Sequence, residues 1–191
     1  MKIWAIAAMA ITAAGTASAR NVQLPMQVPT EPGIPVCVET TGSSSAALFL
    51  AEGLTSKMFV AAGVTIDWRR GHNCPADGIR ISVSEDTPDA DHPHAYAYAL
   101  PYEGAHIVLF QDRIQAAAGQ RAQPFLLAHV LVHELTHILE GTCRHSDTGI
   151  LKAVFTQADI AQMELHPLPF AEEDLELIHF GLEIRRNRAA Q

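Results

Sequence analysis

The stretch from Ala122 to Glu140 constrains the fold of this chain more than any other part of it. Leu127, Leu131 and Leu135 recur there at helical spacing, which predicts a long helix with one apolar face. Gly141 follows directly, and glycine is the residue that most often ends a helix in the left-handed conformation. A helix with such a face must pack against other elements, so it predicts a globular domain built around it.

The same predicted helix carries a candidate metal site. His133 and His137 are four residues apart, so both imidazoles project from one side of the helix at the spacing that lets two histidines bind one Zn²⁺. Glu134 cannot readily reach that metal, but its carboxylate can reach a water bound to the metal. We therefore expect Glu134 to act as the general base when zinc-bound water attacks a carbonyl, and to pass the proton to the leaving amine.

The residues beyond this motif carry a family resemblance. The pattern His-Glu-x-x-His-x-x-x-Gly-x-x-x-His, from His133 to His145, resembles an expanded form of the metzincin signature. In metzincins a glycine lets the chain turn back after the active-site helix, and a third histidine completes the zinc site. The usual glycine and histidine stand three and six residues after the second ligand, whereas here they stand four and eight residues after it. The resemblance implies a zincin fold and His145 as the third zinc ligand.

Two other residues compete with His145 for the third position. Cys143 stands where metzincins usually place the third histidine, and thiolates bind zinc well. Asp147 is the second alternative, because carboxylate oxygens also serve as zinc ligands. Gly141 supports any of the three, since a left-handed residue reverses the chain at the end of the helix.

The run His-Ser-x-x-Gly-Ile at 145–150 is similar to that of a group of uncharacterised bacterial zincin-like proteins, in which it usually ends in Met. Leu151 stands at that place, and Met163 lies further on, so both are candidates for the Met that metzincins place under the zinc. The chain has no Tyr after Tyr102 to stabilise an oxyanion. A backbone N–H or Arg144 would then have to stabilise the oxyanion, although we interpret Arg144 as an ordinary surface charge.

Other titratable residues have weaker claims to a function. His129 precedes His133 by four residues, but Val130 stands where the general base would be, so we interpret His129 as a core residue or a support for the site. An acidic loop further upstream could favour a basic substrate, bind a second metal or be solvated, and we favour the last. Its candidate residues are Asp89, Asp91, His92 and His94.

The elements around the long helix predict an α+β fold. Short strands, a first helix ended by Gly63 and a final helix that starts at Glu172 surround it. The resemblance makes this a zincin/metzincin-like fold: a mixed twisted sheet packed on the active-site helix, with a C-terminal helix. In metzincins the edge strand pairs with an extended peptide, which implies that role for Ala95 to Leu100 or His106 to Phe110. The other predicted segments are strands at 36–40, 64–68 and 79–83 and helices at 47–61 and 156–164.

The first residues have the pattern of a secretory signal. Lys2 precedes an apolar run from Ile3 to Ile11, and a small-x-small pattern ends at Ala19. That run is well short of the roughly 20 residues that a membrane span needs, which argues against an uncleaved anchor. We therefore expect a signal peptide at 1–19, a single metzincin-like catalytic domain at 20–191, and a secreted or periplasmic protein.

Export makes one disulfide plausible among the three cysteines, and we prefer Cys37–Cys74, which leaves Cys143 over. The formal net charge of −8 argues against nucleic acid and anionic lipid as partners. We predict an exported monomeric zinc metallopeptidase, a hydrolase of peptide or protein substrates. The alternatives are a zincin-fold amidase on another substrate and a non-catalytic zinc-binding module, and Glu134 argues against the module because a structural site needs no base.

Overall fold

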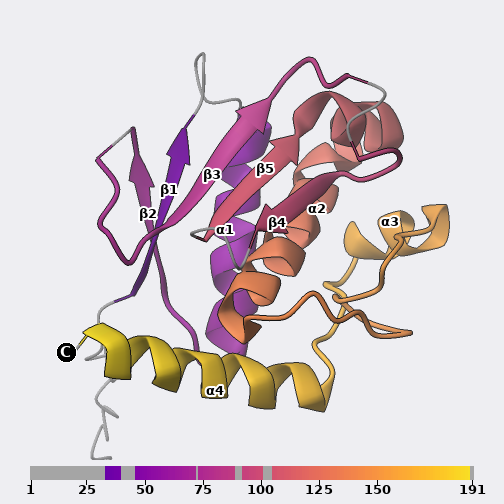
Figure 1. Ribbon diagram of the computed structural model, residues 1–191. Helices are drawn as coiled ribbons and strands as arrows, with labels where there is room; N and C mark the ends of the chain where they lie inside the picture. The colour runs from indigo at the N-terminus through magenta and orange to yellow at the C-terminus, as the bar shows by residue number, and fades with distance from the viewer. Residues whose placement is uncertain (1–32, 40–45, 72, 89–91, 101–104, 190–191) are drawn as a thin grey trace, which may run out of the picture. The chain divides into compact units, whose positions relative to one another are not determined.

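The computed structural model describes residues 33–39, 46–71, 73–88, 92–100 and 105–189 (Figure 1). These residues belong to one compact unit, Glu31–Gln191. The predicted signal peptide at 1–19 lies outside the described residues. Within them, no helix combines the length and the apolar character that a membrane crossing requires.

One mixed sheet has the strand order β2-β1-β3-β5-β4 (Figure 1). Four strands run parallel to their neighbours, while β4 pairs antiparallel with β5 and lies at the edge of the sheet. Of the two segments predicted to pair with a substrate, β4 is therefore the edge strand and β5 is internal. The strands are β1 Ile34–Glu39, β2 Ile66–Arg70, β3 Ile79–Ser84, β4 Ala97–Leu100 and β5 His106–Phe110.

The helices α1 and α2 cover one face of this sheet, and α4 crosses near the C-terminal end of α2 (Figure 1). On β3, Ile79 and Ile81 are buried while Arg80 is exposed, because successive side chains of a strand point to opposite faces. The predicted mixed sheet packed on the long helix, α2, is therefore confirmed. The helices are α1 Ala46–Ala61, α2 Gln111–Glu140, α3 Gln157–Met163 and α4 Glu172–Ala189.

The helix α2 begins earlier than the sequence pattern predicted. Gly119 has φ 64° and ψ 178°, so a break separates a short first segment from the predicted helix. In the segment before the break, Ile114 is the one buried side chain. A single apolar anchor produces no helical periodicity, which is why the predicted helix started near Ala122.

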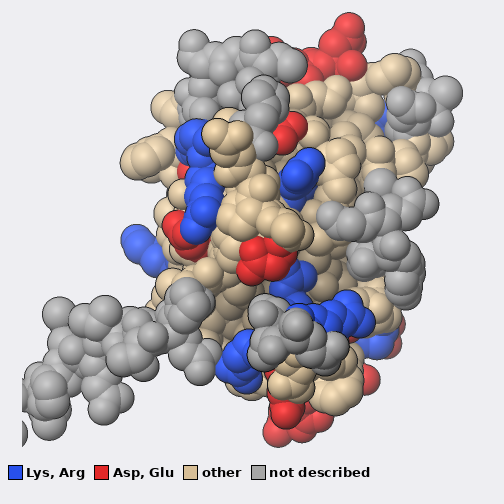
Figure 2. All heavy atoms as spheres, turned by 60° about the vertical axis from the view of Figure 1, so that its left-hand side comes forward, with Lys and Arg blue, Asp and Glu red and all other residues tan. Residues whose placement is uncertain are grey.

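The disulfide that the sequence analysis preferred is confirmed. Cys37 of β1 forms a disulfide with Cys74, and Cys143 is a free, exposed thiol. Figure 2 shows the face that includes the β2 edge, where basic and acidic side chains lie interspersed. On this strand Arg69 pairs with Asp67 at 2.8 Å.

Gly181 allows α4 to lie directly on the last turn of α2. A Cβ atom at this position would overlap the carbonyl oxygen of Leu139 and approach the Cα atom of Glu140. Backbone atoms cannot rotate away as a flexible side chain can, so only a glycine fits without moving one helix. The place of α4 relative to α2 therefore depends on this residue.

We expect Gly181→Ala to lower the free energy of unfolding by about 1 to 3 kcal/mol, the usual cost of overpacking. Gly53→Ala is the matched control, because Gly53 also lies inside a helix and a Cβ there meets nothing within 4 Å. That control should raise stability by about 0.5 to 1 kcal/mol. Urea unfolding of both variants measures the difference, and equal stability of the two would contradict a close contact between Gly181 and the backbone of Leu139.

Candidate metal centre

Three residues of the predicted motif lie together on the C-terminal half of α2. His133, Glu134 and His137 are 8%, 8% and 4% exposed, respectively. Leu131 and Leu135 are fully buried in the core on the same helix. The long helix therefore divides its surface as the spacing predicted, with the apolar face in the core and the two histidines beside a cleft.

The turn after α2 brings a third histidine to this pair. Gly141 adopts the left-handed conformation, with φ 68° and ψ 29°, and its N–H donates to the carbonyl of His137. The chain reverses there, and His145 returns to the helix. Its ring centroid lies 5.2 Å from that of His133 and 5.0 Å from that of His137. The potential ligand atoms of the three histidines all lie within 4.8 Å of one another.

The donor atoms of this cluster fit a cation. The Nε2 atoms of His133 and His137 face each other at 3.0 Å. The Nδ1 atom of His133 lies 2.9 Å from the carbonyl of Ile150, which can only accept, so Nδ1 carries the proton and Nε2 keeps a free lone pair. Such a hydrogen bond to the far nitrogen is usual for metal-binding histidines.

Burial keeps the imidazoles of His133 and His137 neutral. It lowers the pKa of His133 from 6.5 to about 4 and that of His137 to about 3. It also lowers the pKa of His145. A protonated imidazole cannot bind a metal, so these lowered pKa values leave the lone pairs of His133 and His137 available at neutral pH. The chemistry of the donor set therefore matches that of a Zn²⁺ site with three histidines.

The other two candidates for the third position lie apart from this group. The described residues whose ligand atoms meet here are His133, His137 and His145. Cys143 lines the cleft with an exposed thiol, and Asp147 is also exposed. The geometry thus brings His145, the residue that the family resemblance implied, next to His133 and His137. Neither Cys143 nor Asp147 belongs to this group of ligand atoms.

Backbone hydrogen bonds hold the segment after His145. Ser146 donates its N–H to Leu151 at 2.9 Å, and Ile150 donates its N–H to Pro169 at 2.9 Å. Gly149 has φ 77°, and a Cβ there would meet the Pro169 carbonyl, so this turn needs glycine. The Ile150 carbonyl that orients His133 is therefore fixed by the following segment.

The apolar contact with His133 comes from a residue that the sequence did not point to. Phe155 packs against this ring with a centroid distance of 5.8 Å and an interplanar angle of 83°. Leu151 and Met163, the two candidates for the metzincin Met, are both buried in the core. Phe155 belongs to no motif, so no sequence signal could have identified it.

Glu134 and the edge strand line one cleft of about 310 Å³. Burial raises the pKa of Glu134 from 4.5 to about 8. Tyr96 to Ala99, which include most of β4, form part of the lining next to the three histidines. An extended chain lying along β4 would therefore pass the histidine cluster and Glu134. The remaining lining residues are His94, Ala95, Val130, Cys143, Lys152, Ala153, Val154 and Phe155.

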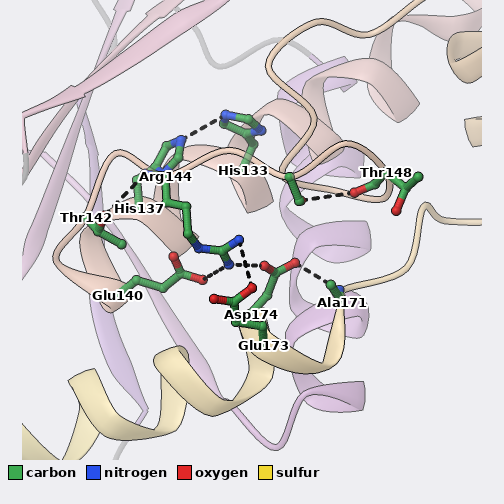
Figure 3. Close-up of polar contacts among 10 residues, drawn as sticks. His133, His137, Glu140, Thr142, Arg144, Thr148, Ala171, Glu173 and Asp174 are labelled. Atoms are coloured by element: carbon green, nitrogen blue, oxygen red, sulfur yellow. Dashed lines mark hydrogen bonds and ion pairs between the residues drawn. The ribbon is translucent and has the colours of Figure 1, made fainter.

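The interpretation of Arg144 as an ordinary surface charge is wrong. Its side chain is 26% exposed and forms ion pairs with Asp174 at 2.5 Å and Glu173 at 3.4 Å (Figure 3). It is also absent from the lining of the cleft described above. A guanidinium bound in this way is not free to stabilise an oxyanion. The sequence placed Arg144 beside His145 but could not reveal Glu173 and Asp174, the acidic partners that begin a different helix.

His129 is a core residue, as predicted. Its Nε2 atom accepts the N–H of Leu168 at 3.0 Å, so the ring proton is on Nδ1, which donates to the carbonyl of Phe125 at 2.7 Å. With both nitrogens engaged, His129 has no lone pair left for a metal.

Part of the acidic loop contacts the site. Asp89 and Asp91 lie outside the described residues. His92 stacks on Tyr98 with ring centroids 4.0 Å apart, and His94 lines the cleft. The described part of this loop therefore borders both β4 and the cleft.

No protein-family model and no curated protein matches this chain. Among solved structures, the chain is similar to the crystal structure of archaemetzincin from Methanopyrus kandleri, with a TM-score of 0.59 and 11% sequence identity. The similarity covers 82% of this chain and 99% of archaemetzincin. At this identity the similarity shows a shared fold alone. In the described residues of this chain, that fold is a five-stranded and mostly parallel sheet with four helices. The predicted mixed sheet with packed helices agrees with this similarity in fold.

Proposed function

We propose that this protein is a zinc-dependent peptidase whose metal ligands are His133, His137 and His145. The convergence of these three imidazoles beside the buried Glu134 carries the proposal. The similarity in fold to archaemetzincin supports this proposal, because the name of that protein refers to the metzincins, the family that the motif resembles. Zn²⁺ at the three histidines would supply a Lewis acid that polarises the scissile carbonyl and makes water easier to deprotonate.

The protein's own groups have separate parts in this reaction. The edge strand β4 offers its backbone to an extended peptide, which aligns the chain along the cleft. Glu134 takes a proton from the attacking water and delivers it to the leaving nitrogen. The raised pKa of about 8 describes the carboxyl without a metal, and a nearby cation lowers the pKa of a carboxyl. Glu134 is then an ionised base at neutral pH.

Export is part of the proposal. The disulfide between Cys37 and Cys74 supports it, because such bonds persist in oxidising compartments and are rare in the cytosol. The signal pattern in residues 1–19 supports it independently.

The test is the metal content and hydrolytic activity of the purified protein. We expect close to one zinc per chain by elemental analysis, and cleavage of an unfolded protein substrate that a chelator abolishes and added Zn²⁺ restores. Folded protein that binds no zinc would rule out the whole proposal. Zinc binding without cleavage in a broad peptide library would favour a non-catalytic module instead.

A further inference from the structure

Arg144, the residue before His145, is surrounded by carboxylates from two helices (Figure 3). Glu140 belongs to the last turn of α2, and Asp174 to the first turn of α4. The side chains of Glu140 and Asp174 are 0% exposed. Arg144 lies 3.9 Å from Glu140 and 2.5 Å from Asp174, measured from Nη2 to the nearest carboxylate oxygen. The guanidinium thus joins the loop that carries His145 to both helices.

Asp174 is itself held in place. Its Oδ2 atom accepts the backbone N–H of Ala171 at 2.9 Å, which caps the start of α4. Its Oδ1 atom accepts from Arg144. With one oxygen used by its own helix and the other by Arg144, this carboxylate transmits the position of α4 to the loop.

The helix α4 is in turn seated on the helix that carries the other two histidines. Gly181 brings α4 against the backbone of Leu139, two residues after His137. A path of direct contacts therefore runs from α2 through α4 and Asp174 to Arg144. Because His145 is the next residue, this path limits where its imidazole can lie relative to His133 and His137.

We propose that Arg144 is a positioning residue that holds His145 in place as the third metal ligand, and that its ion pair with Asp174 sets the metal affinity of the site. This inference rests on the proposed metal site. The contact with Glu173 matters little, because the Glu173 side chain is 66% exposed and exposed ion pairs are weak. The contact with Asp174 matters because losing one partner leaves the other charge buried and unpaired.

The test measures zinc affinity of the full chain by competition with a chromophoric chelator. Arg144→Gln and Asp174→Asn should each bind zinc about 10- to 100-fold more weakly, the usual loss when a residue that supports a metal ligand is removed. The double variant should lose little more than either single variant, because both changes break the same contact. Arg144→Lys keeps the charge without the planar fork, so its affinity should lie between wild type and Arg144→Gln.

A spectroscopic measurement separates positioning from stability. With Co²⁺ in place of Zn²⁺, the visible absorption bands report ligand geometry, and Arg144→Gln should change their position and intensity. A residue that only stabilises the fold would leave these bands unchanged in folded protein. Unfolding of the metal-free variants, followed by circular dichroism, shows that affinity is compared between folded proteins.

Arg70→Gln is the matched control. Arg70 of β2 pairs at 2.6 Å with Glu52 of α1, whose side chain is 6% exposed, so this change also removes an arginine from a buried carboxylate. It should cost stability and leave zinc affinity and the Co²⁺ spectrum unchanged.

Three outcomes would overturn the inference while wild type binds zinc. The first is that Arg144→Gln binds zinc as tightly as wild type does. The second is that Arg70→Gln loses as much zinc affinity as Arg144→Gln. The third is that the Co²⁺ spectrum of Arg144→Gln is the same as that of wild type. If Arg144→Gln does not fold, Arg144→Lys decides by the same measurements, and wild-type affinity there overturns the inference. Absence of zinc binding in the wild-type protein would instead defeat the proposed function.

Discussion

Glu134→Gln should retain zinc and lower the rate of peptide hydrolysis by about 10²- to 10⁴-fold, the usual contribution of a general base. Glutamine has nearly the same size and keeps the buried position, which is 8% exposed, but its amide cannot take a proton from water. Elemental analysis and the cleavage rate of an unfolded protein substrate measure the two quantities on one sample.

The same variant makes a separate prediction for the metal-free protein. The folded pKa of Glu134 is about 8, above the ordinary 4.5, so its contribution to stability is fully present below pH 4.5 and is lost as the pH rises through 8. Glutamine does not titrate. The variant should therefore gain stability relative to wild type as the pH rises from about 4.5 to 8, measured by thermal unfolding with a chelator.

Two results would count against this role of Glu134. Cleavage by the variant at the wild-type rate would mean that another group takes the proton. Loss of zinc together with activity would mean that Glu134 supports the site rather than the reaction. Glu176→Gln is a suitable control, since Glu176 lies on α4 and is not among the residues that line the cleft. It should change neither quantity.

His145→Ala should weaken zinc binding by more than about 100-fold, because the loss of a ligand exceeds the loss of a residue that merely supports one. Cys143→Ser and Asp147→Asn should bind zinc as wild type does, since neither residue belongs to the group of converging ligand atoms. Competition with a chromophoric chelator measures all three variants under one set of conditions.

His166→Ala provides the matched control for this series, because His166 is an exposed histidine outside the cluster. Its affinity should equal that of wild type. If Cys143→Ser loses zinc while His145→Ala retains it, the third ligand is the cysteine at the usual metzincin position. If Asp147→Asn loses zinc while His145→Ala retains it, the third ligand is the carboxylate of Asp147.

Several elements could be predicted because their cause is local. The four-residue spacing of His133 and His137 puts both rings on one side of any helix that contains them. Gly141 ends that helix because glycine adopts a positive φ without a steric penalty, and the structure has φ 68° there. Thr156 and Asp159 form a capping box at the start of α3, where a short helix was expected.

Other features could not be predicted because they depend on contacts between distant segments. Both Ala95 to Leu100 and His106 to Phe110 had the pattern of a strand, and only their pairing in space shows that the second is internal. The partner of Arg144 on α4, Asp174, follows it by 30 residues, a separation that no local pattern encodes.

The histidine pair, the glutamate beside it and the turn that follows were thus predictable from the chain itself, because helix geometry and glycine conformation act over a few residues. That His145, and not Cys143 or Asp147, lies with this pair could not be predicted in the same way. It depends on how the reversed loop is held, through Arg144 by α4 and through Ile150 by Pro169. These contacts join separate segments of the chain, so the convergence of the three histidines is a property of the folded domain.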